Sequence, residues 1–221
     1  MNAQNDFGFW SGIKISAPVA KDFKIGLEAE TRFDRNGSRM KTAFISPYAS
    51  WDASNYFRIG LEYRLSSSSF NAAVANRILS HRYALDFEFR NIIDLIKDKS
   101  NLGLTFRLRG TKEYETLKRT DNYFRLRIKA DYKIPKSKLE PYLSAELFYH
   151  LSDQITYTYS EVNTVNNINK LRASLGFKYE ISKQHEVKLF SIYQRQLLKA
   201  ENDLIIGAGY SYSINKIKNK D

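Results

Sequence analysis

The sequence predicts an all-β protein that folds as an antiparallel up-and-down transmembrane β-barrel of ten to twelve strands. Apolar and polar residues alternate in segments that recur along the whole 221-residue chain, as on strands whose two faces meet different surroundings. Many segments reach ten residues, whereas strands of globular proteins average about 5–6. Short and long connections alternate between them, as in barrels with short turns on one side of a membrane and longer loops on the other.

The segment YFRLRIKADYKI (123–134) shows the alternation most clearly. One face carries Phe124, Leu126, Ile128, Ala130, Tyr132 and Ile134, and the other carries Arg125, Arg127, Lys129, Asp131 and Lys133. Successive side chains of a strand point to opposite faces, so this strand has one apolar and one charged side. The pattern fits a soluble barrel and a membrane barrel alike, because the two differ in which side meets water.

The first four predicted strands lie in the N-terminal third of the chain. They are FGFWSGIKIS (7–16), FKIGLEAETRF (23–33), TAFISPYASW (42–51) and FRIGLEYRL (57–65). In the second and fourth, apolar residues alternate with polar residues or glycine along nearly the whole length. The third contains Pro47, which has no N–H to donate and therefore predicts an edge strand or a bend.

Seven more segments follow the same pattern. They are HRYALDFEFR (81–90), LGLTFRLRG (102–110), the segment 123–134, PYLSAELFYHLS (141–152), NKLRASLGFKYEI (169–181), HEVKLFSIYQRQ (185–196) and NDLIIGAGYSYSI (202–214). The stretch NIIDLIKDK (91–99) is helix-like but short, and we interpret it as a turn. Bacterial barrels have an even number of strands. Eleven segments therefore predict either that 7–16 is not a barrel strand or that one strand is missing from the set.

The connections set the two ends of the predicted barrel apart. The short ones are 19–22, 52–55, 134–138 and 181–184, and the long ones are 34–41, 66–77, 110–122, 152–169 and 197–203. The run SSSS (66–69) predicts a flexible loop. The stretch 154–167 predicts a hairpin that pairs with itself beyond the membrane; the alternative is a site for a partner or ligand at Tyr157 and Tyr159.

Composition limits the class of protein. The net charge is +11 and the chain has no cysteine, so it is compatible with any redox compartment. The 24 carboxylates are interleaved with the basic residues, which argues against a nucleic-acid surface. No stretch approaches the roughly 18 apolar residues of a membrane helix. We expect residues 1–6 to be either a remnant left after signal-peptide removal or an ordinary polar N-terminus, residues 7–216 to form the barrel, and residues 217–221 a polar tail.

Arginine is concentrated on the charged faces of the predicted strands. Ten arginines and six lysines lie there, although the chain has 15 arginines and 20 lysines. The planar guanidinium can hold several carboxylates in a confined space, so the charged face is expected to line a lumen. A soluble barrel or sandwich with a charged surface is the alternative. The predicted lumen residues are Glu28, Glu30, Arg32, Glu62, Arg64, Arg82, Glu88, Arg90, Arg107, Arg109, Arg125, Arg127, Glu146 and Arg172.

The order of several short motifs resembles a known family. The motifs are NDFGFW (5–10), LEAETRF (27–33), GLEYRL (60–65), SHRYALDFEFR (80–90), FRLRG (106–110), PYLSAELFY (141–149) and YEISKQHEVKLFSIYQ (179–194). Together they resemble the Bacteroidota outer-membrane β-barrels grouped as domain of unknown function 2490. The resemblance implies an outer-membrane barrel, and it transfers no functional residue because the family has no assigned activity.

The residues give little support for an enzyme or a metal site. Without cysteine and without a close histidine pair, a transition-metal site is not expected, and no cofactor is predicted. His81 is expected to be structural and His185 to be a solvated turn residue. His150 and Ser152 have the spacing of a membrane-phospholipase dyad, but the flanking elements of that family are absent. Ser152, which precedes Asp153, is more simply a turn residue.

These observations predict a barrel with a narrow lumen, which is either a small pore that favours anions or a barrel plugged by its own salt bridges. In the pore, replacing a lumen arginine with alanine is expected to raise conductance or to reverse selectivity. The expected partner is outer-membrane lipid. Three alternatives stay open: a non-enzymatic subunit bound to another outer-membrane protein, an outer-membrane lipid hydrolase, and a soluble ligand-binding barrel.

Overall fold

The computed structural model describes residues 5–71, 74–95, 100–115, 120–151, 167–197 and 201–214. Within these residues, each of the eleven predicted segments coincides with a β-strand and extends past its end by no more than two residues. The strands are β1 (Asn5–Pro18), β2 (Phe23–Asp34), β3 (Arg39–Asp52), β4 (Phe57–Asn71), β5 (Val74–Phe89), β6 (Leu102–Glu115), β7 (Asp121–Tyr132), β8 (Leu139–Leu151), β9 (Asn167–Glu180), β10 (His185–Gln196) and β11 (Glu201–Ser213). One 3-10 helix, η1 (Ile92–Leu95), follows β5. No helix among the described residues is long and apolar enough to cross a membrane.

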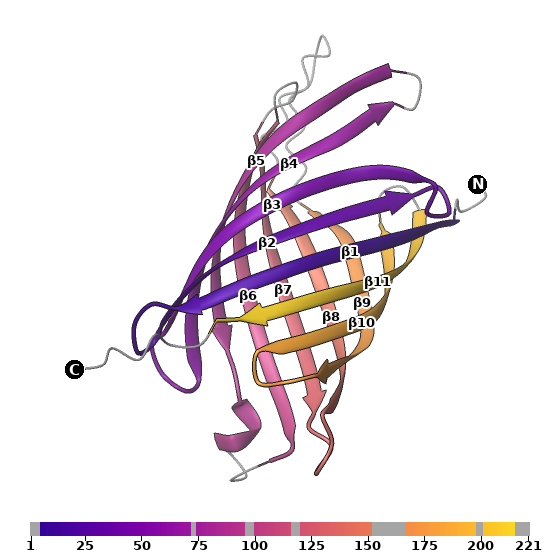
Figure 1. Ribbon diagram of the computed structural model, residues 1–221. Helices are drawn as coiled ribbons and strands as arrows, with labels where there is room; N and C mark the ends of the chain where they lie inside the picture. The colour runs from indigo at the N-terminus through magenta and orange to yellow at the C-terminus, as the bar shows by residue number, and fades with distance from the viewer. Residues whose placement is uncertain are drawn as a thin grey trace.

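The eleven strands close into one barrel (Figure 1), which confirms the predicted fold class. Neighbours in sequence pair antiparallel, whereas β1 and β11 pair in parallel, from Asn5 opposite Asn202 to Ser16 opposite Ser213. An odd number of strands in up-and-down order must bring the first and last together in the same direction. The expectation of an even number is therefore wrong, and 7–16 is a barrel strand.

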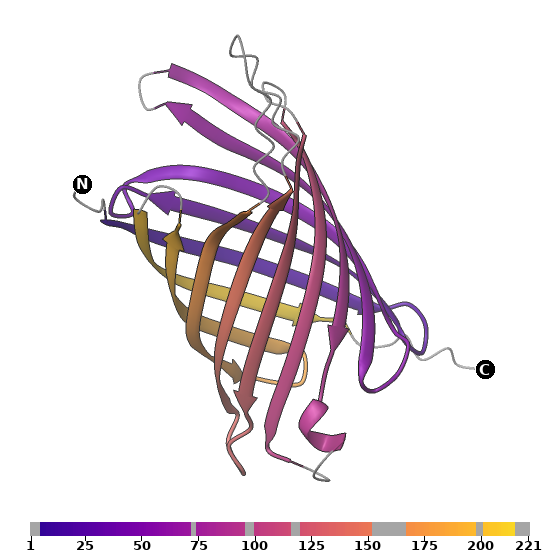
Figure 2. The same cartoon turned by 180° about the vertical axis from the view of Figure 1, so that it is seen from behind.

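The two ends of the barrel differ less in loop length than predicted. The turn rim is the end with connections 19–22, 53–56, 90–101, 133–138 and 181–184, and the loop rim is the end with connections 35–38, 72–73, 116–120, 152–166 and 197–200. Strands β4 and β5 continue into the predicted loop 66–77 and form a hairpin that extends past its neighbours (Figures 1 and 2). The serines of 66–69 lie in β4, and Ser66 is hydrogen-bonded to Ser80 at 2.9 Å, so this run is not a flexible loop.

The distribution of apolar and charged side chains defines the class of barrel. Outward-facing aliphatic residues are widely exposed, with Leu61 and Leu175 each 60% accessible. Inward-facing charged residues are buried, with Arg109 and Glu146 each 7% accessible. An apolar outer band around a polar interior is the arrangement of a transmembrane β-barrel, and it is the reverse of a soluble barrel.

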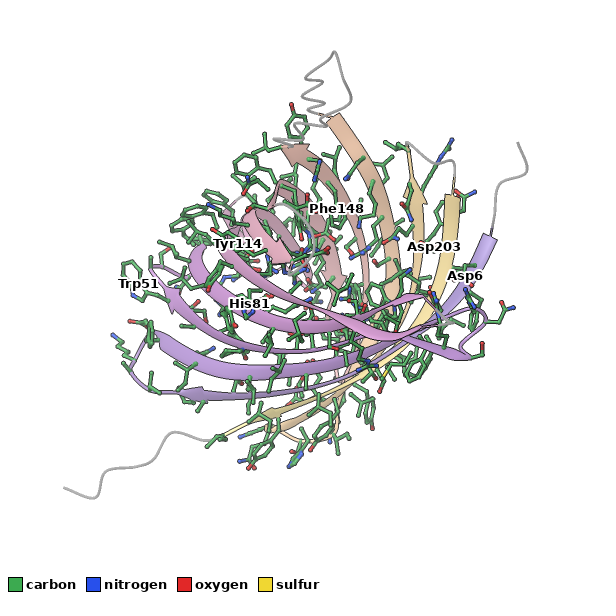
Figure 3. The ribbon with its side chains drawn as sticks, turned by 90° about the horizontal axis from the view of Figure 1, so that it is seen from above. Asp6, Trp51, His81, Tyr114, Phe148 and Asp203 are labelled. Atoms are coloured by element: carbon green, nitrogen blue, oxygen red, sulfur yellow. The ribbon has the colours of Figure 1, made fainter. Side chains whose placement is uncertain are left out.

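Aromatic side chains gather on the outer surface near both rims. Those near the turn rim are Phe23, Trp51, Tyr56, Phe89, Tyr132 and Tyr179, and those toward the loop rim are Phe9, Tyr114, Phe124 and Tyr193. Figure 3 shows Trp51 on the outer edge of the barrel, whereas Phe148 lies among the side chains of the interior. Such girdles mark the two lipid–water interfaces of a membrane barrel.

Pro47 lies inside the sheet and not at an edge, because β3 pairs with both β2 and β4. The ladder to β2 includes Pro47 opposite Leu27. The ladder to β4 passes from Ile45 to Tyr48 without Ser46 and Pro47. The closed barrel has no free edge, so the missing proline N–H is accommodated as a local gap in one ladder.

Gly207 on β11 allows an aromatic ring to lie against the inner wall. The ring of Phe190, from the opposing position of β10, occupies the space that a Cβ at Gly207 would need. The backbone of Gly209, two residues along the same face, has no such neighbour. A Cβ there would meet nothing closer than 3.9 Å.

We expect Gly207→Ala to lower the free energy of unfolding by about 1–3 kcal/mol, because the methyl group would displace the Phe190 ring. Gly209→Ala is the matched control, and its expected effect is within about 0.5 kcal/mol. Urea unfolding of the lipid-embedded protein, followed by heat-dependent gel mobility, measures both. Equal stability of the two variants would contradict the packing described here.

Candidate functional site

The interior of the barrel holds a cavity of about 830 Å³ that is lined by residues from all eleven strands. Alternate residues of each strand face it, as the period of two requires. Thirteen of the fourteen predicted lumen residues lie along it, and Arg90 does not. The thirteen are Glu28, Glu30, Arg32, Glu62, Arg64, Arg82, Glu88, Arg107, Arg109, Arg125, Arg127, Glu146 and Arg172.

Arg90 instead belongs to a cluster at the turn rim. It follows the last residue of β5, and its Nη2 donates to Oδ1 of Asp52 at 2.8 Å. The same carboxylate accepts hydrogen bonds from Nε and Nη2 of Arg58 at 2.5 and 3.0 Å. Arg90 therefore lies at the turn rim, beyond the residues that line the cavity. The strand ends before it, so strand alternation no longer fixes its direction.

Three pairs of arginines lie directly opposite each other on neighbouring strands. They are Arg64 and Arg82, Arg107 and Arg127, and Arg109 and Arg125. Like charges in such positions repel. All six arginines form an ion pair with a carboxylate on the lumen wall. The carboxylates therefore allow this density of cations inside the barrel.

Glu62 on β4 holds the first part of this network. Its carboxylate lies 3.0 Å from Arg64, 3.2 Å from Arg82 and 2.9 Å from Arg109. Arg109 also makes a bidentate contact to Asp86, with hydrogen bonds of 2.7 and 2.5 Å. Fork-to-fork contacts of this kind are short and geometrically specific, so the β4–β6 part of the wall is rigidly cross-linked.

Glu146 on β8 holds the second part. Its oxygens lie 2.9 Å from Arg107, 2.8 Å from Arg125 and 3.4 Å from Arg172. Arg107 lies 3.8 Å from Asp86, so it links this carboxylate to the Glu62 side. We call the nine residues of both parts the arginine–carboxylate network: Arg64, Arg82, Arg107, Arg109, Arg125, Arg172, Glu62, Asp86 and Glu146.

A second group of lumen cations rests on aromatic rings. Lys14 lies 4.4 Å from the ring centre of Tyr48, Lys170 lies 4.3 Å from Phe148, and Arg32 lies 4.0 Å from Trp10. Lys14 and Lys170 form no ion pair with any residue in the described part of the chain. Ring faces attract cations but carry no negative charge of their own, so these two contacts add no counter-charge to the lumen.

The histidines do not form a catalytic or metal-binding group in the described residues. His81 faces outward and is hydrogen-bonded to Tyr63 at 2.8 Å. His185 begins β10 and packs against Tyr210 and Tyr212, so it is not simply a solvated turn residue. His150 lies 3.5 Å from Asp121, and its suggested partner Ser152 lies outside the described residues. No cluster of three metal-ligating side chains occurs among them.

The sequence interpretation did not assign the aromatic residues of the lumen. Trp10, Tyr48, Tyr142, Phe148 and Phe190 all line the cavity. The alternation of side chains along each strand predicts which face these residues occupy. In HEVKLFSIYQ, for example, Phe190 shares the face of Lys188. The face of the strand on which a residue lies therefore indicates a lumen position even for an aromatic side chain.

The fold and the lumen together define a transmembrane β-barrel with an arginine-rich interior. Residues 7–205 match the family described as "Protein of unknown function (DUF2490)", so the chain belongs to this family, as its motifs predicted. No curated protein matches the chain. Among solved structures, a KdgM porin is similar, with 15% sequence identity and a TM-score of 0.45 over 82% of this chain and 81% of that chain.

Proposed function

We propose that the protein is a narrow pore of a bacterial outer membrane that favours small anions. The observation that carries this proposal is the charge of the cavity wall. Fourteen lysines and arginines line it against eight aspartates and glutamates. A confined surface with excess positive charge attracts anions and repels cations.

The open route is expected to follow the parallel junction of β1 and β11. Gly12 and Gly209 lie opposite each other there and line the cavity. Packing does not require glycine at position 209, because a Cβ there would meet nothing closer than 3.9 Å. The missing side chain at Gly209 leaves space at this point of the lumen wall, whereas the arginine–carboxylate network occupies the wall from β4 to β9.

The continuity of that network favours a second candidate, a closed structural barrel. Its ion pairs connect Arg82 on β5 through Glu62, Arg109 and Asp86 to Glu146 on β8. A network that also spans the lumen would block ions, and the role of the protein would then lie in the membrane architecture around it.

The deciding experiment is single-channel recording from the purified, folded chain in a planar lipid bilayer. We expect small, steady currents and a reversal potential of anion-selective sign in a potassium chloride gradient. Folding is established first by heat-dependent gel mobility. Silence from folded protein would overturn the pore and favour the closed barrel, whereas cation selectivity would contradict the charge argument.

A cysteine variant tests whether current flows along the glycine-lined side. The chain has no native cysteine, so Gly209→Cys carries the only thiol. A negatively charged thiosulfonate reagent is expected to lower its current by about half, because it adds bulk and negative charge inside the lumen. The matched control is Ile206→Cys on the lipid-facing side of β11, where Ile206 is 47% exposed. Its current should not change.

A further inference from the structure

In one cross-strand pair of lumen cations, one member has no carboxylate partner among the described residues. Lys178 on β9 lies directly opposite Lys188 on β10. Lys178 is paired with Glu140 at 2.6 Å. Lys188 forms no ion pair and no hydrogen bond with any residue that the structure describes, although each arginine of the three opposed arginine pairs has a carboxylate partner.

The surroundings of Lys188 are cationic and aromatic. Its amine lies 5.1 Å from the ring centre of Tyr142 and 4.8 Å from that of Phe190. Lys129 lies 5.4 Å from the same Tyr142 ring, and Arg127 and Lys178 line the same cavity. The nearby carboxylate of Glu30 is bound to Arg32 at 2.6 Å, so it is already occupied.

Arg127 is the second cation here with unused donors. Its only described ion pair is with Glu88, at 3.6 Å, which is beyond hydrogen-bonding distance. Its Nε is buried and has no partner among the described residues. Lys129, by contrast, donates to Asp131 at 2.7 Å. Lys188 and Arg127 therefore present free donors to the cavity, from β10 and β7.

We infer that Lys188 and Arg127 form a binding site for a small divalent oxyanion of the phosphate class. An ammonium and a planar guanidinium together supply several N–H donors, and the guanidinium fork matches an oxyanion bidentately. At the three opposed arginine pairs, carboxylates of the lumen wall supply the negative charge. Here a doubly charged ligand would supply it. The site lies on the wall of the proposed pore, where it would concentrate anions that pass through the lumen. Its role therefore rests on the proposed function.

The test measures binding of inorganic phosphate directly and needs no conduction. Equilibrium dialysis with radiolabelled phosphate uses the folded full-length chain in a maltoside detergent, so that no lipid phosphate competes. We expect saturable binding to the wild type. Lys188→Gln and Arg127→Gln should each raise the Kd about tenfold or more, as expected when a charged hydrogen-bonding partner is removed. Lys112→Gln, an exposed lysine on β6, is the matched control and should bind as the wild type does.

The outcomes separate this site from the pore. Saturable binding that both lumen substitutions weaken, in variants with normal heat-dependent mobility, supports the site whether or not the barrel conducts. No binding to the wild type, or equal binding by all variants, overturns the site even if the bilayer currents are anion-selective. Binding that returns only when phospholipid is added assigns the site to a lipid headgroup and overturns a site for free phosphate.

Discussion

Replacing Glu146 with glutamine is expected to lower the free energy of unfolding by about 3–5 kcal/mol, the cost of removing one partner from a buried ion pair. Three arginines converge on this carboxylate: Arg107, Arg125 and Arg172. A neutral amide would leave their charges repelling one another inside the barrel. Urea titration of the protein in lipid vesicles, followed by heat-dependent gel mobility, gives the change in stability.

Glu88→Gln is the matched control for this prediction. Glu88 also faces the lumen, but its contacts to Arg127 and Arg58 are longer, at 3.6 and 4.0 Å. We expect a change of no more than about 1 kcal/mol, as for loosely held ion pairs. If Glu146→Gln were as mild as Glu88→Gln, water in the lumen would be screening the arginines, and the network would not hold the barrel together.

Replacing Leu126 with arginine is expected to destabilise the membrane-embedded barrel by about 2–4 kcal/mol, the cost of a cation on the lipid-facing side near the bilayer midplane. Leu126 lies halfway along β7, is 46% exposed, and sits between two lumen arginines in sequence. The substitution tests which face meets lipid. Refolding yield into vesicles and the urea midpoint of the inserted protein measure the effect.

Leu102→Arg is the depth control for that substitution. Leu102 is 41% exposed and begins β6 next to the turn rim. Arginine near the interface costs only about 0–1 kcal/mol, so this variant should fold almost normally. A soluble barrel would tolerate both substitutions, because each would place a charge in water. Equal tolerance would therefore refute the transmembrane assignment.

Strand positions were predictable from the sequence because the alternation of side chains is local. Every predicted segment coincides with a strand to within two residues at its ends, and the part of 123–134 that lies in β7 shows its two faces as expected. Strand ends were less predictable. The run Ser66–Ser69 contains no alternating apolar residues that would predict a strand. Its pairing with β3 and β5 is visible only in the folded barrel. Strand alternation likewise does not fix the position of Arg90, which follows the end of β5.

The arrangement of the lumen charges depends on register, and register is not local. The sequence placed Glu146 and Arg172 on inward faces, but it could not show that three arginines share Glu146. It also could not show that Lys188 lies opposite Lys178 or that Phe190 lies over Gly207. These contacts join residues of different strands, so they follow only from the ladder that pairs them. The parallel pairing of β1 with β11 depends on the number of strands and not on register, and the expectation of an even number prevented its prediction.

The odd number of strands also determines where the chain enters and leaves the barrel. Asn5 begins β1 at the loop rim, whereas β11 ends with Ser213 at the turn rim (Figure 1). An even-stranded barrel would place both points on one side of the membrane. Epitope tags at the two ends of this chain would therefore be exposed to opposite compartments, and a protease added from one side should remove only one of them. The sidedness of the inserted protein can thus be determined without altering any residue of the barrel.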